Sequence, residues 1–208
     1  MHTTQTPTKK TVKMTVFDAH IEKSQIATLP TLTYEGRIIT IDTAADVDKA
    51  MKALSKETIV GIDTETRPAF RKGVQHKVSL LQLSTADTCF LIRLNRTGMP
   101  DSLVTFLENS KITKVGVSLH DDYQSLARRH KFKAGGFFDL QKYVGDFGIE
   151  EMSLQKIYAI IFGMRISKSQ QLTNWEQDVL TDKQKQYAAT DAWACLNIYN
   201  RLKQINNR

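Results

Sequence analysis

The sequence is organised around a short apolar run that ends in two carboxylates, Ile59-Val-Gly-Ile-Asp-Thr-Glu65. Its β-branched residues are typical of a buried strand. Because side chains alternate between the two faces of a strand, we expect Asp63 and Glu65 to point to one side and Thr64 to the other. Gly61 indicates a place where a neighbouring element approaches closely.

Two carboxylates on one face of a buried strand repel each other, and burial disfavours their charged forms further. A bound cation would offset both effects, and oxygen ligands favour Mg²⁺ or Mn²⁺ over Zn²⁺. An isolated Asp-x-Glu at a strand end is nevertheless most often solvated. The metal interpretation therefore requires further acids from elsewhere in the chain.

The composition is that of one globular domain with a basic surface. The 208 residues are 41% hydrophobic and 25% charged, and 29 Lys and Arg against 22 acids give a net charge of +7. This excess favours a polyanionic partner such as nucleic acid. Cys89 and Cys195 form no Cys-x-x-Cys or Cys/His cluster, which argues against a zinc site and a disulfide framework.

Residues 1–30 are poor in large apolar side chains, and we expect them to form a largely flexible N-terminal tail with a short helix around Glu22 to Thr28. Residues 31–208 form the predicted functional domain. The chain has no apolar run of transmembrane length and no signal-peptide-like stretch. We therefore expect a cytoplasmic protein with no membrane partner; protein partners are left open.

Hydrophobic periodicity predicts strands followed by interleaved and then dominant helices, which implies a mixed sheet with helices on its faces. Val78 to Ser84 and Thr88 to Leu94 are expected to form an antiparallel hairpin. The other predicted strands are 37–41, 59–65 and 115–118, and the predicted helices are 43–54, one around 103–107, one from the Ser153 cap to Gly163, and one from the Thr181 capping box to about Leu202.

One candidate for a third acid lies where the strand at Val115 runs into a helix, Leu119-His-Asp-Asp-Tyr. Asp122 lies one helical turn before Leu126 and hence at the edge of the buried face, so it is chosen over Asp121. Either carboxylate would also be favoured at a helix N-terminus by the helix dipole, so this stretch alone leaves both interpretations open.

A second candidate lies in the last predicted helix, within Tyr187-Ala-Ala-Thr-Asp191. Residues four apart share a helical face, so Tyr187 and Asp191 project together. The surrounding alanines would let this helix lie close against a sheet, where Asp191 could reach the end of the carboxylate strand. A tightly packed core helix whose Asp191 meets a lysine or water is the alternative.

Together, Asp63-Thr-Glu65, Asp122 in its Val-Gly-Val-Ser-Leu-His-Asp-Asp setting, and Tyr187-Ala-Ala-Thr-Asp191 resemble the three motifs of the DEDDy 3′-to-5′ exonucleases, most closely ribonuclease D and the Werner-syndrome exonuclease domain. The resemblance covers roughly residues 37–203. It implies an α/β, ribonuclease-H-like fold with a mixed five-stranded sheet flanked by helices.

The resemblance also implies a mechanism. Asp63, Glu65, Asp122 and Asp191 would hold two divalent cations, Mg²⁺ or Mn²⁺, for hydrolysis of phosphodiester bonds at DNA or RNA 3′ ends. Tyr187 would orient the attacking water, since its ordinary pKa near 10 argues against a strong base. Gln186 occupies the position of the histidine in the related DEDDh branch and excludes that branch.

Substrate contacts are predicted around the first motif. The backbone of Thr64 and Thr66 could approach the terminal sugar, Phe70 could stack on a base or simply pack, and Arg67 and Lys168 could contact phosphates or remain solvated. Trp175 is expected in the core. The alternatives to an active nuclease are a catalytically inactive nucleic-acid-binding module of the same fold and a metal-stabilised interaction module.

Overall fold

A mixed sheet of six strands forms the centre of the computed structural model, which describes residues 16–71 and 73–207. The strand order is β1-β4-β3-β2-β5-β6. β3 is antiparallel to its neighbours β4 and β2, whereas the pairs β1–β4, β2–β5 and β5–β6 are parallel. The strands are β1 (Arg37–Ile41), β2 (Ile59–Thr66), β3 (Val78–Ser84), β4 (Thr88–Ile92), β5 (Thr113–Gly116) and β6 (Phe137–Asp139).

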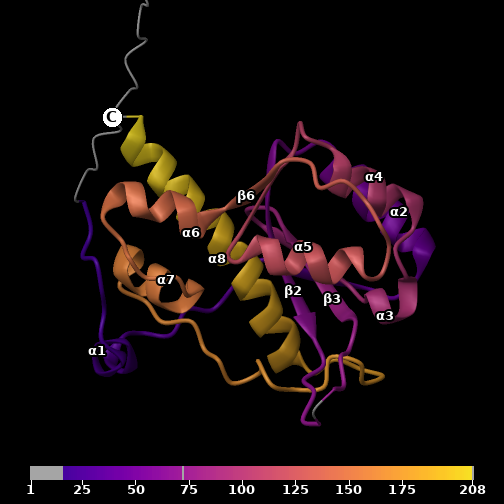
Figure 1. The fold of residues 1–208 in the computed structure, drawn as a ribbon, viewed down its shortest axis with the longest axis horizontal. Coiled ribbons are helices and arrows are strands. Elements are labelled where there is room, and N and C mark those ends of the chain that lie inside the picture. The colour runs from indigo at the N-terminus through magenta and orange to yellow at the C-terminus, as the bar shows by residue number, and fades with distance from the viewer. Residues whose placement is uncertain (1–15, 72, 208) are drawn as a thin grey trace, which may run out of the picture.

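The long C-terminal helix α8 crosses the molecule, with α6 and α7 on one side and α2 to α5 on the other (Figure 1). It contacts five strands, from β1 to β5. The helices are α1 (Lys23–Thr28), α2 (Ala44–Leu54), α3 (Leu94–Thr97), α4 (Asp101–Glu108), α5 (Leu119–Ala127), α6 (Leu140–Tyr143), the 3₁₀ helix η1 (Val144–Phe147), α7 (Leu154–Phe162) and α8 (Asp182–Asn206).

The central strands bury both faces, and the two faces differ. Leu81 and Leu83 of β3 pack in one cluster with Ile62 and with side chains of α2 and α4. Leu80 faces the other way and packs with Trp175 and the alanines of α8. This alternation follows from the two-residue period of a strand, and it directs Asp63 and Glu65 to the α8 side.

The α/β class and the predicted hairpin are confirmed, but the sheet has six strands rather than the expected five. The strand that the sequence did not reveal is β6, only three residues long. It follows Gly135 and Gly136, where the chain passes so close to the end of α4 that a Cβ on Gly135 would lie 2.0 Å from the Glu108 carbonyl oxygen. This turn delivers Phe137–Asp139 to the edge strand β5.

Element boundaries also differ from the predictions. The strand expected to run to Leu94 ends at Ile92, because Leu94 begins the short helix α3. The strand expected at 115–118 spans Thr113–Gly116, since Ser118 adopts a left-handed conformation with φ 60° and caps α5. The final helix begins at the predicted capping box and continues beyond Leu202 to Asn206.

Residues 1–15 of the expected tail lie outside the described residues. The amides of Val16 and Phe17 donate to the Phe147 carbonyl oxygen at 3.1 and 3.2 Å. Ile26 of α1 is buried, and the Leu32 amide donates to the Arg165 carbonyl at 2.8 Å. The division into residues 1–30 and 31–208 stays a prediction.

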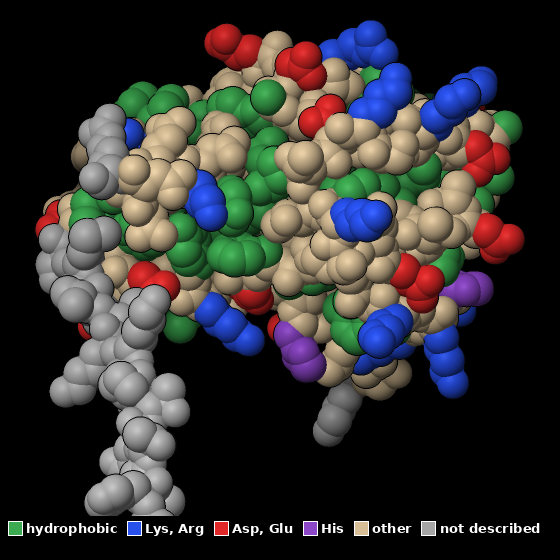
Figure 2. All heavy atoms as spheres, turned by 90° about the horizontal axis from the view of Figure 1, so that it is seen from above, with side chains coloured by type: hydrophobic (Ala, Val, Ile, Leu, Met, Phe, Trp, Pro, Cys, Tyr) green, Lys and Arg blue, Asp and Glu red, His purple; other side chains and the backbone are tan. Residues whose placement is uncertain are grey.

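Over residues 16–71 and 73–207, no helix is both long and apolar enough to cross a bilayer. On the face drawn in Figure 2, Lys and Arg side chains are spread among acidic ones rather than gathered in one block. Over the described residues, this face therefore shows no concentrated basic patch that would by itself mark a binding site for a polyanion (Figure 2).

Candidate active site

Strand β2 carries Asp63 and Glu65 past the point where its parallel neighbour ends. β2 pairs with β5 only over Ile59–Gly61, whereas its antiparallel pairing with β3 continues to Thr66. The last half of β2 therefore has one open edge, beside which the chain can place other groups. Glu65 is 8% exposed and Asp63 is partly buried.

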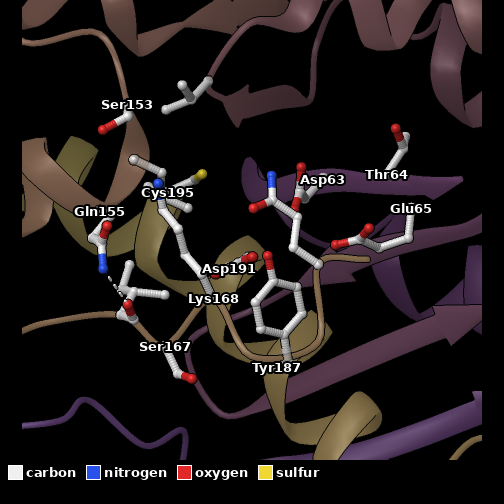
Figure 3. Close-up of a pocket in the computed structure, with 14 residues that line it drawn as sticks. Asp63, Thr64, Glu65, Ser153, Gln155, Ser167, Lys168, Tyr187, Asp191 and Cys195 are labelled. Atoms are coloured by element: carbon white, nitrogen blue, oxygen red, sulfur yellow. Dashed lines mark hydrogen bonds between the residues drawn. The ribbon is translucent and has the colours of Figure 1, made fainter. Parts of the chain in front are cut away.

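Helix α8 brings Tyr187 and Asp191 to the same place. Its alanines at 188, 189 and 192 are fully buried, and it approaches β2 so closely that a Cβ on Gly61 would lie 1.9 Å from the Ala192 carbonyl oxygen. Gly61 is thus the close approach that the sequence indicated. Figure 3 shows Asp191 and the Tyr187 ring directed toward the two acids of β2.

Three carboxylates converge as a result. Asp63, Glu65 and Asp191 each offer an oxygen atom, and these oxygens lie within 4.8 Å of one another. Asp191 is 6% exposed, and its Oδ1 has no hydrogen-bond partner among the described residues. An unpartnered buried carboxylate oxygen is costly unless a ligand or water satisfies it.

The pKa values of the three carboxyl groups reflect the same cost of burying them together. Burial, together with the charges of Asp122 and Asp191, raises the pKa of Asp63 well above its ordinary value. Burial and the neighbouring acids raise the pKa of Glu65 to about 9. Burial raises the pKa of Asp191 to about 7, although Tyr187 and then Lys168 oppose the shift.

This donor set fits divalent cations. All three groups are carboxylates, which are the hard oxygen ligands that Mg²⁺, Mn²⁺ and Ca²⁺ prefer. A cation would restore the charged forms that burial and mutual repulsion disfavour, and it would satisfy Asp191 Oδ1. Lys168 is the only basic side chain that lines the described part of this pocket, so the protein itself supplies little compensating charge.

Asp122 approaches the same strand end from the other side. Thr64 points away from the three acids, as the alternation predicts, and its Oγ1 donates to Asp122 Oδ1 at 2.5 Å. Asp121 is exposed, whereas Asp122 is partly buried and raises the pKa of Asp63. The structure therefore favours Asp122 over Asp121, but its oxygens are not among the three that converge within 4.8 Å.

A special turn places Asp122. Ser118 has φ 60°, which is uncommon for a residue other than glycine, and the Leu119 amide donates to Asp139 Oδ2 at 3.0 Å. Asp139 of β6 thereby supports the start of α5. Burial raises the pKa of Asp122 to about 6, and the hydrogen bond from Thr64 limits the shift.

Tyr187 is held against the core. Its ring centroid lies 6.0 Å from that of Trp175, which is fully buried as expected. Burial, followed by the charges of Asp191 and Glu65, raises the pKa of the Tyr187 hydroxyl above its ordinary value. The hydroxyl is therefore a proton donor in a hydrogen bond rather than a base.

The acids line a pocket of about 240 Å³ whose opposite wall was not predicted (Figure 3). Ser153 and Gln155 at the start of α7 form part of that wall, and Gln171 closes another side. Cys195 lies at the base, 1% exposed, with its pKa raised by burial. Cys195 lies four residues after Asp191 on the same helix, so helical spacing could have placed it in the pocket. Ser153 was recognised from the sequence only as a helix cap.

The predicted substrate residues fall into two groups. Thr64 and Lys168 line the acid pocket. Arg67 and Phe70 line a separate hollow of about 610 Å³ beside the β2–β3 loop, where Phe70 is 83% exposed and Arg67 forms an ion pair with Glu176 at 3.3 Å. Plain packing of Phe70 is therefore excluded. Thr66 ends β2 and pairs with Val78.

Comparisons with known proteins identify the family of this chain. A family model described as 3′-5′ exonuclease matches residues 38–206. The "Bifunctional 3'-5' exonuclease/ATP-dependent helicase WRN" of Mus musculus is 31% identical over 201 residues, which are 91% of this chain but 14% of that protein. A 3′-5′ exonuclease of Arabidopsis thaliana is 30% identical over 204 residues, covering 89% of this chain and 70% of the relative.

Solved structures share the fold. The Aedes aegypti Nibbler EXO domain superposes with a TM-score of 0.76 at 22% identity, over 85% of this chain and 94% of that one. Escherichia coli RNase D superposes with a TM-score of 0.72 at 21% identity, over 83% of this chain and 45% of that one. These neighbours confirm the expected ribonuclease-H-like architecture.

Proposed function

Since this chain belongs to the 3′-5′ exonuclease family, we propose that it hydrolyses the terminal phosphodiester bond of a nucleic acid with two divalent cations, Mg²⁺ or Mn²⁺. Asp63, Glu65, Asp122 and Asp191 would hold the cations, and Tyr187 would assign the chain to the DEDDy branch. The convergence of three carboxylate oxygens within 4.8 Å carries this proposal. The cations would supply charge opposite the phosphoryl oxygens and an activated water.

The protein's own residues then have separate roles. Asp63 would hold the cations together with its strand neighbour Glu65 and the helix residue Asp191, whose oxygens lie within 4.8 Å of its own. Tyr187 keeps its proton and donates a hydrogen bond that orients the attacking water, because burial beside acids raises the pKa of its hydroxyl. Lys168 at the pocket wall would contact the phosphate.

The substrate would enter beside the β2–β3 loop. Phe70 is a large aromatic side chain at 83% exposure, and Arg67 and Arg71 line the same hollow. An exposed aromatic ring among cations suits a nucleobase with its phosphates. The backbone of Thr64 and Thr66 would lie near the terminal sugar.

The relatives point to both kinds of nucleic acid. Escherichia coli RNase D is described as an exoribonuclease involved in structured RNA processing, and a Trypanosoma brucei RNase D was solved with RNA U12. DNA polymerase I of Aquifex aeolicus is 26% identical to this chain over 160 residues. We propose that the substrate here is a DNA or RNA 3′ end. The cytoplasmic location stays a prediction.

The test uses single-stranded and duplex DNA and RNA labelled at the 5′ end, with Mg²⁺, Mn²⁺ or a chelator. A ladder that shortens from the 3′ end with metal and stops with chelator is the expected result. The matched controls are Asp63→Asn, which should be inactive, and Asp121→Ala, whose exposed side chain should be dispensable. Binding without shortening under every metal condition would support the inactive nucleic-acid-binding module instead.

A further inference from the structure

Gln82 is a buried polar side chain that neither the fold nor the proposed ligand set explains. It lies in the middle of β3 and is fully buried. Neither Nε2 nor Oε1 has a hydrogen-bond partner among the described residues. Leaving a buried donor or acceptor unpaired typically costs about 1–3 kcal/mol, so an apolar residue would serve the core better.

The register places this amide beside the active site. Gln82 pairs directly with Asp63 across the antiparallel β2–β3 ladder. Directly opposite residues point to the same face, with Cβ atoms roughly 4.5–5.5 Å apart. The Gln82 amide therefore starts within reach of the Asp63 carboxylate, on the side covered by α8.

The surroundings leave the amide few other partners. Leu80, two residues earlier on the same face, and Leu91, opposite Gln82 on β4, are fully buried and apolar. Within residues 16–71 and 73–207, Trp175 Nε1 and the Tyr34 hydroxyl also lack a hydrogen-bond partner on the α8 side, but neither belongs to a strand paired with Gln82. Asp63 is the polar side chain directly opposite this amide in the sheet.

We propose that Gln82 is a positioning residue that, when the cations bind, donates a hydrogen bond from Nε2 to the Asp63 carboxylate and fixes its orientation. This inference rests on the proposed function. An amide is suited to the role because it is neutral: it stabilises a charged carboxylate without competing for the cation as a lysine would. Partners that hold metal-ligating groups in this way typically contribute about 10–100-fold to metal affinity or activity.

The proposal predicts that removing the Gln82 amide weakens metal binding without lowering the stability of the metal-free protein. Gln82→Met removes the amide at similar volume. If the amide acts through Asp63, the variant should bind Mn²⁺ about 10–100-fold more weakly by calorimetry, and its nuclease activity should need correspondingly more Mn²⁺. The KM for nucleic acid should stay unchanged. The melting temperature of the metal-free variant should equal or exceed that of the wild type, because an unpartnered amide has left the core.

Ser84→Ala is the matched control. Ser84 lies on the same strand and face as Gln82, two residues further along, but it pairs with Gly61 and donates to the Thr85 carbonyl oxygen. Its Mn²⁺ affinity should match the wild type. Gln82→Leu repeats the main test with a different side-chain shape, so that a packing defect peculiar to methionine is recognised.

Wild-type Mn²⁺ affinity in both Gln82→Met and Gln82→Leu would overturn the proposal. So would a melting temperature below wild type in both metal-free variants, because the amide would then have a structural partner. A wild-type protein without metal-dependent nuclease activity would instead refute the proposed function. The two failures are therefore distinguishable.

Discussion

Strands β2 and β3 present two opposite kinds of buried surface. On the side of α2 and α4, Ile62, Leu81 and Leu83 are fully buried in an apolar cluster. On the side of α8, the same strands bury Glu65 and Gln82 and direct Asp63 toward Asp191. Burial stabilises the fold on the first face. On the second face it raises carboxylate pKa values and leaves polar atoms with no hydrogen-bond partner in the described part of the chain.

The two faces together show how this fold tolerates a site of buried, mutually repelling carboxylates. The residues of α8 that cover the acidic face are small: alanines and the buried Cys195. Because these side chains are small, the helix can pack closely on the sheet around the carboxylates. The apolar face supplies the free energy of folding that keeps this arrangement in place. Mutations on the two faces should consequently have opposite effects on stability and on catalysis.

The largest expected effect is on catalysis, from Asp63→Asn. Loss of one converging charge should lower nuclease activity by roughly 10³-fold or more, since transition-state stabilisation by the cations is lost. The metal-free melting temperature should rise, because repulsion among the remaining acids is smaller. Activity assays and thermal melts with chelator measure both. Activity above a tenth of the wild-type value would contradict the assignment of Asp63 to the cation site.

On the apolar face, Leu81→Ala should have the reverse profile. It removes a fully buried side chain and should lower the free energy of unfolding by about 2–5 kcal/mol, measured by urea denaturation. Mn²⁺ affinity of the folded protein should stay at the wild-type value. A large loss of metal affinity in stably folded Leu81→Ala would show that the two faces are not independent.

Tyr187→Phe should sharpen the account of the acidic face. The variant keeps the ring that packs near Trp175 but loses the hydroxyl. We expect kcat to fall about 10–100-fold with KM nearly unchanged, because the hydroxyl orients water and does not hold the substrate. Steady-state kinetics on a 3′-end substrate decide this. A raised KM with normal kcat would instead assign Tyr187 to substrate binding.

The smallest expected effect is the pH dependence of the metal-free fold. The pKa of Glu65 is raised from 4.5 to about 9 and that of Asp191 from 3.8 to about 7. A carboxyl group with a raised folded-state pKa binds its proton more tightly when folded, so its stabilisation is complete below the unfolded pKa and is lost as pH rises. Melting temperatures with chelator should therefore fall by several degrees between about pH 4 and pH 9.

Two further experiments test whether the carboxyl groups cause this pH dependence of the melting temperature. Glu65→Gln should flatten the upper part of the curve, up to about pH 9, because burial and the neighbouring acids raise the pKa of Glu65 to about 9. Saturating Mg²⁺ should flatten the whole curve, since a cation stabilises the charged carboxylates. An unchanged slope in both experiments would mean that the acids do not govern stability.

Much of this site could be predicted because its signals are local. The two-residue period of β2 placed Asp63 and Glu65 on one face, and the four-residue period of α8 paired Tyr187 with Asp191. Gly61 and the alanines around Asp191 predicted the close packing of α8 on the sheet. Each of these inferences needs only neighbouring residues.

The rest depended on tertiary contacts that no local pattern encodes. Gln82 is one residue of an ordinary apolar strand until the register with Asp63 is known. Three-residue β6 is too short for any period to appear, and it owes its place to the turn at Gly135. Helical spacing alone favoured Asp122 over Asp121, but the hydrogen bond from Thr64 to Asp122 follows only from how α5 meets β2.

Direct titration of the metal-free full chain with Mn²⁺ tests the central claim, that buried carboxylates at the end of β2 form the cation site. Calorimetry should show two ions per chain for the wild type, with binding strongly weakened in Glu65→Gln and intact in Asp121→Ala. Absence of Mn²⁺ binding by the wild type, or equal binding by wild type and Glu65→Gln, would contradict the account.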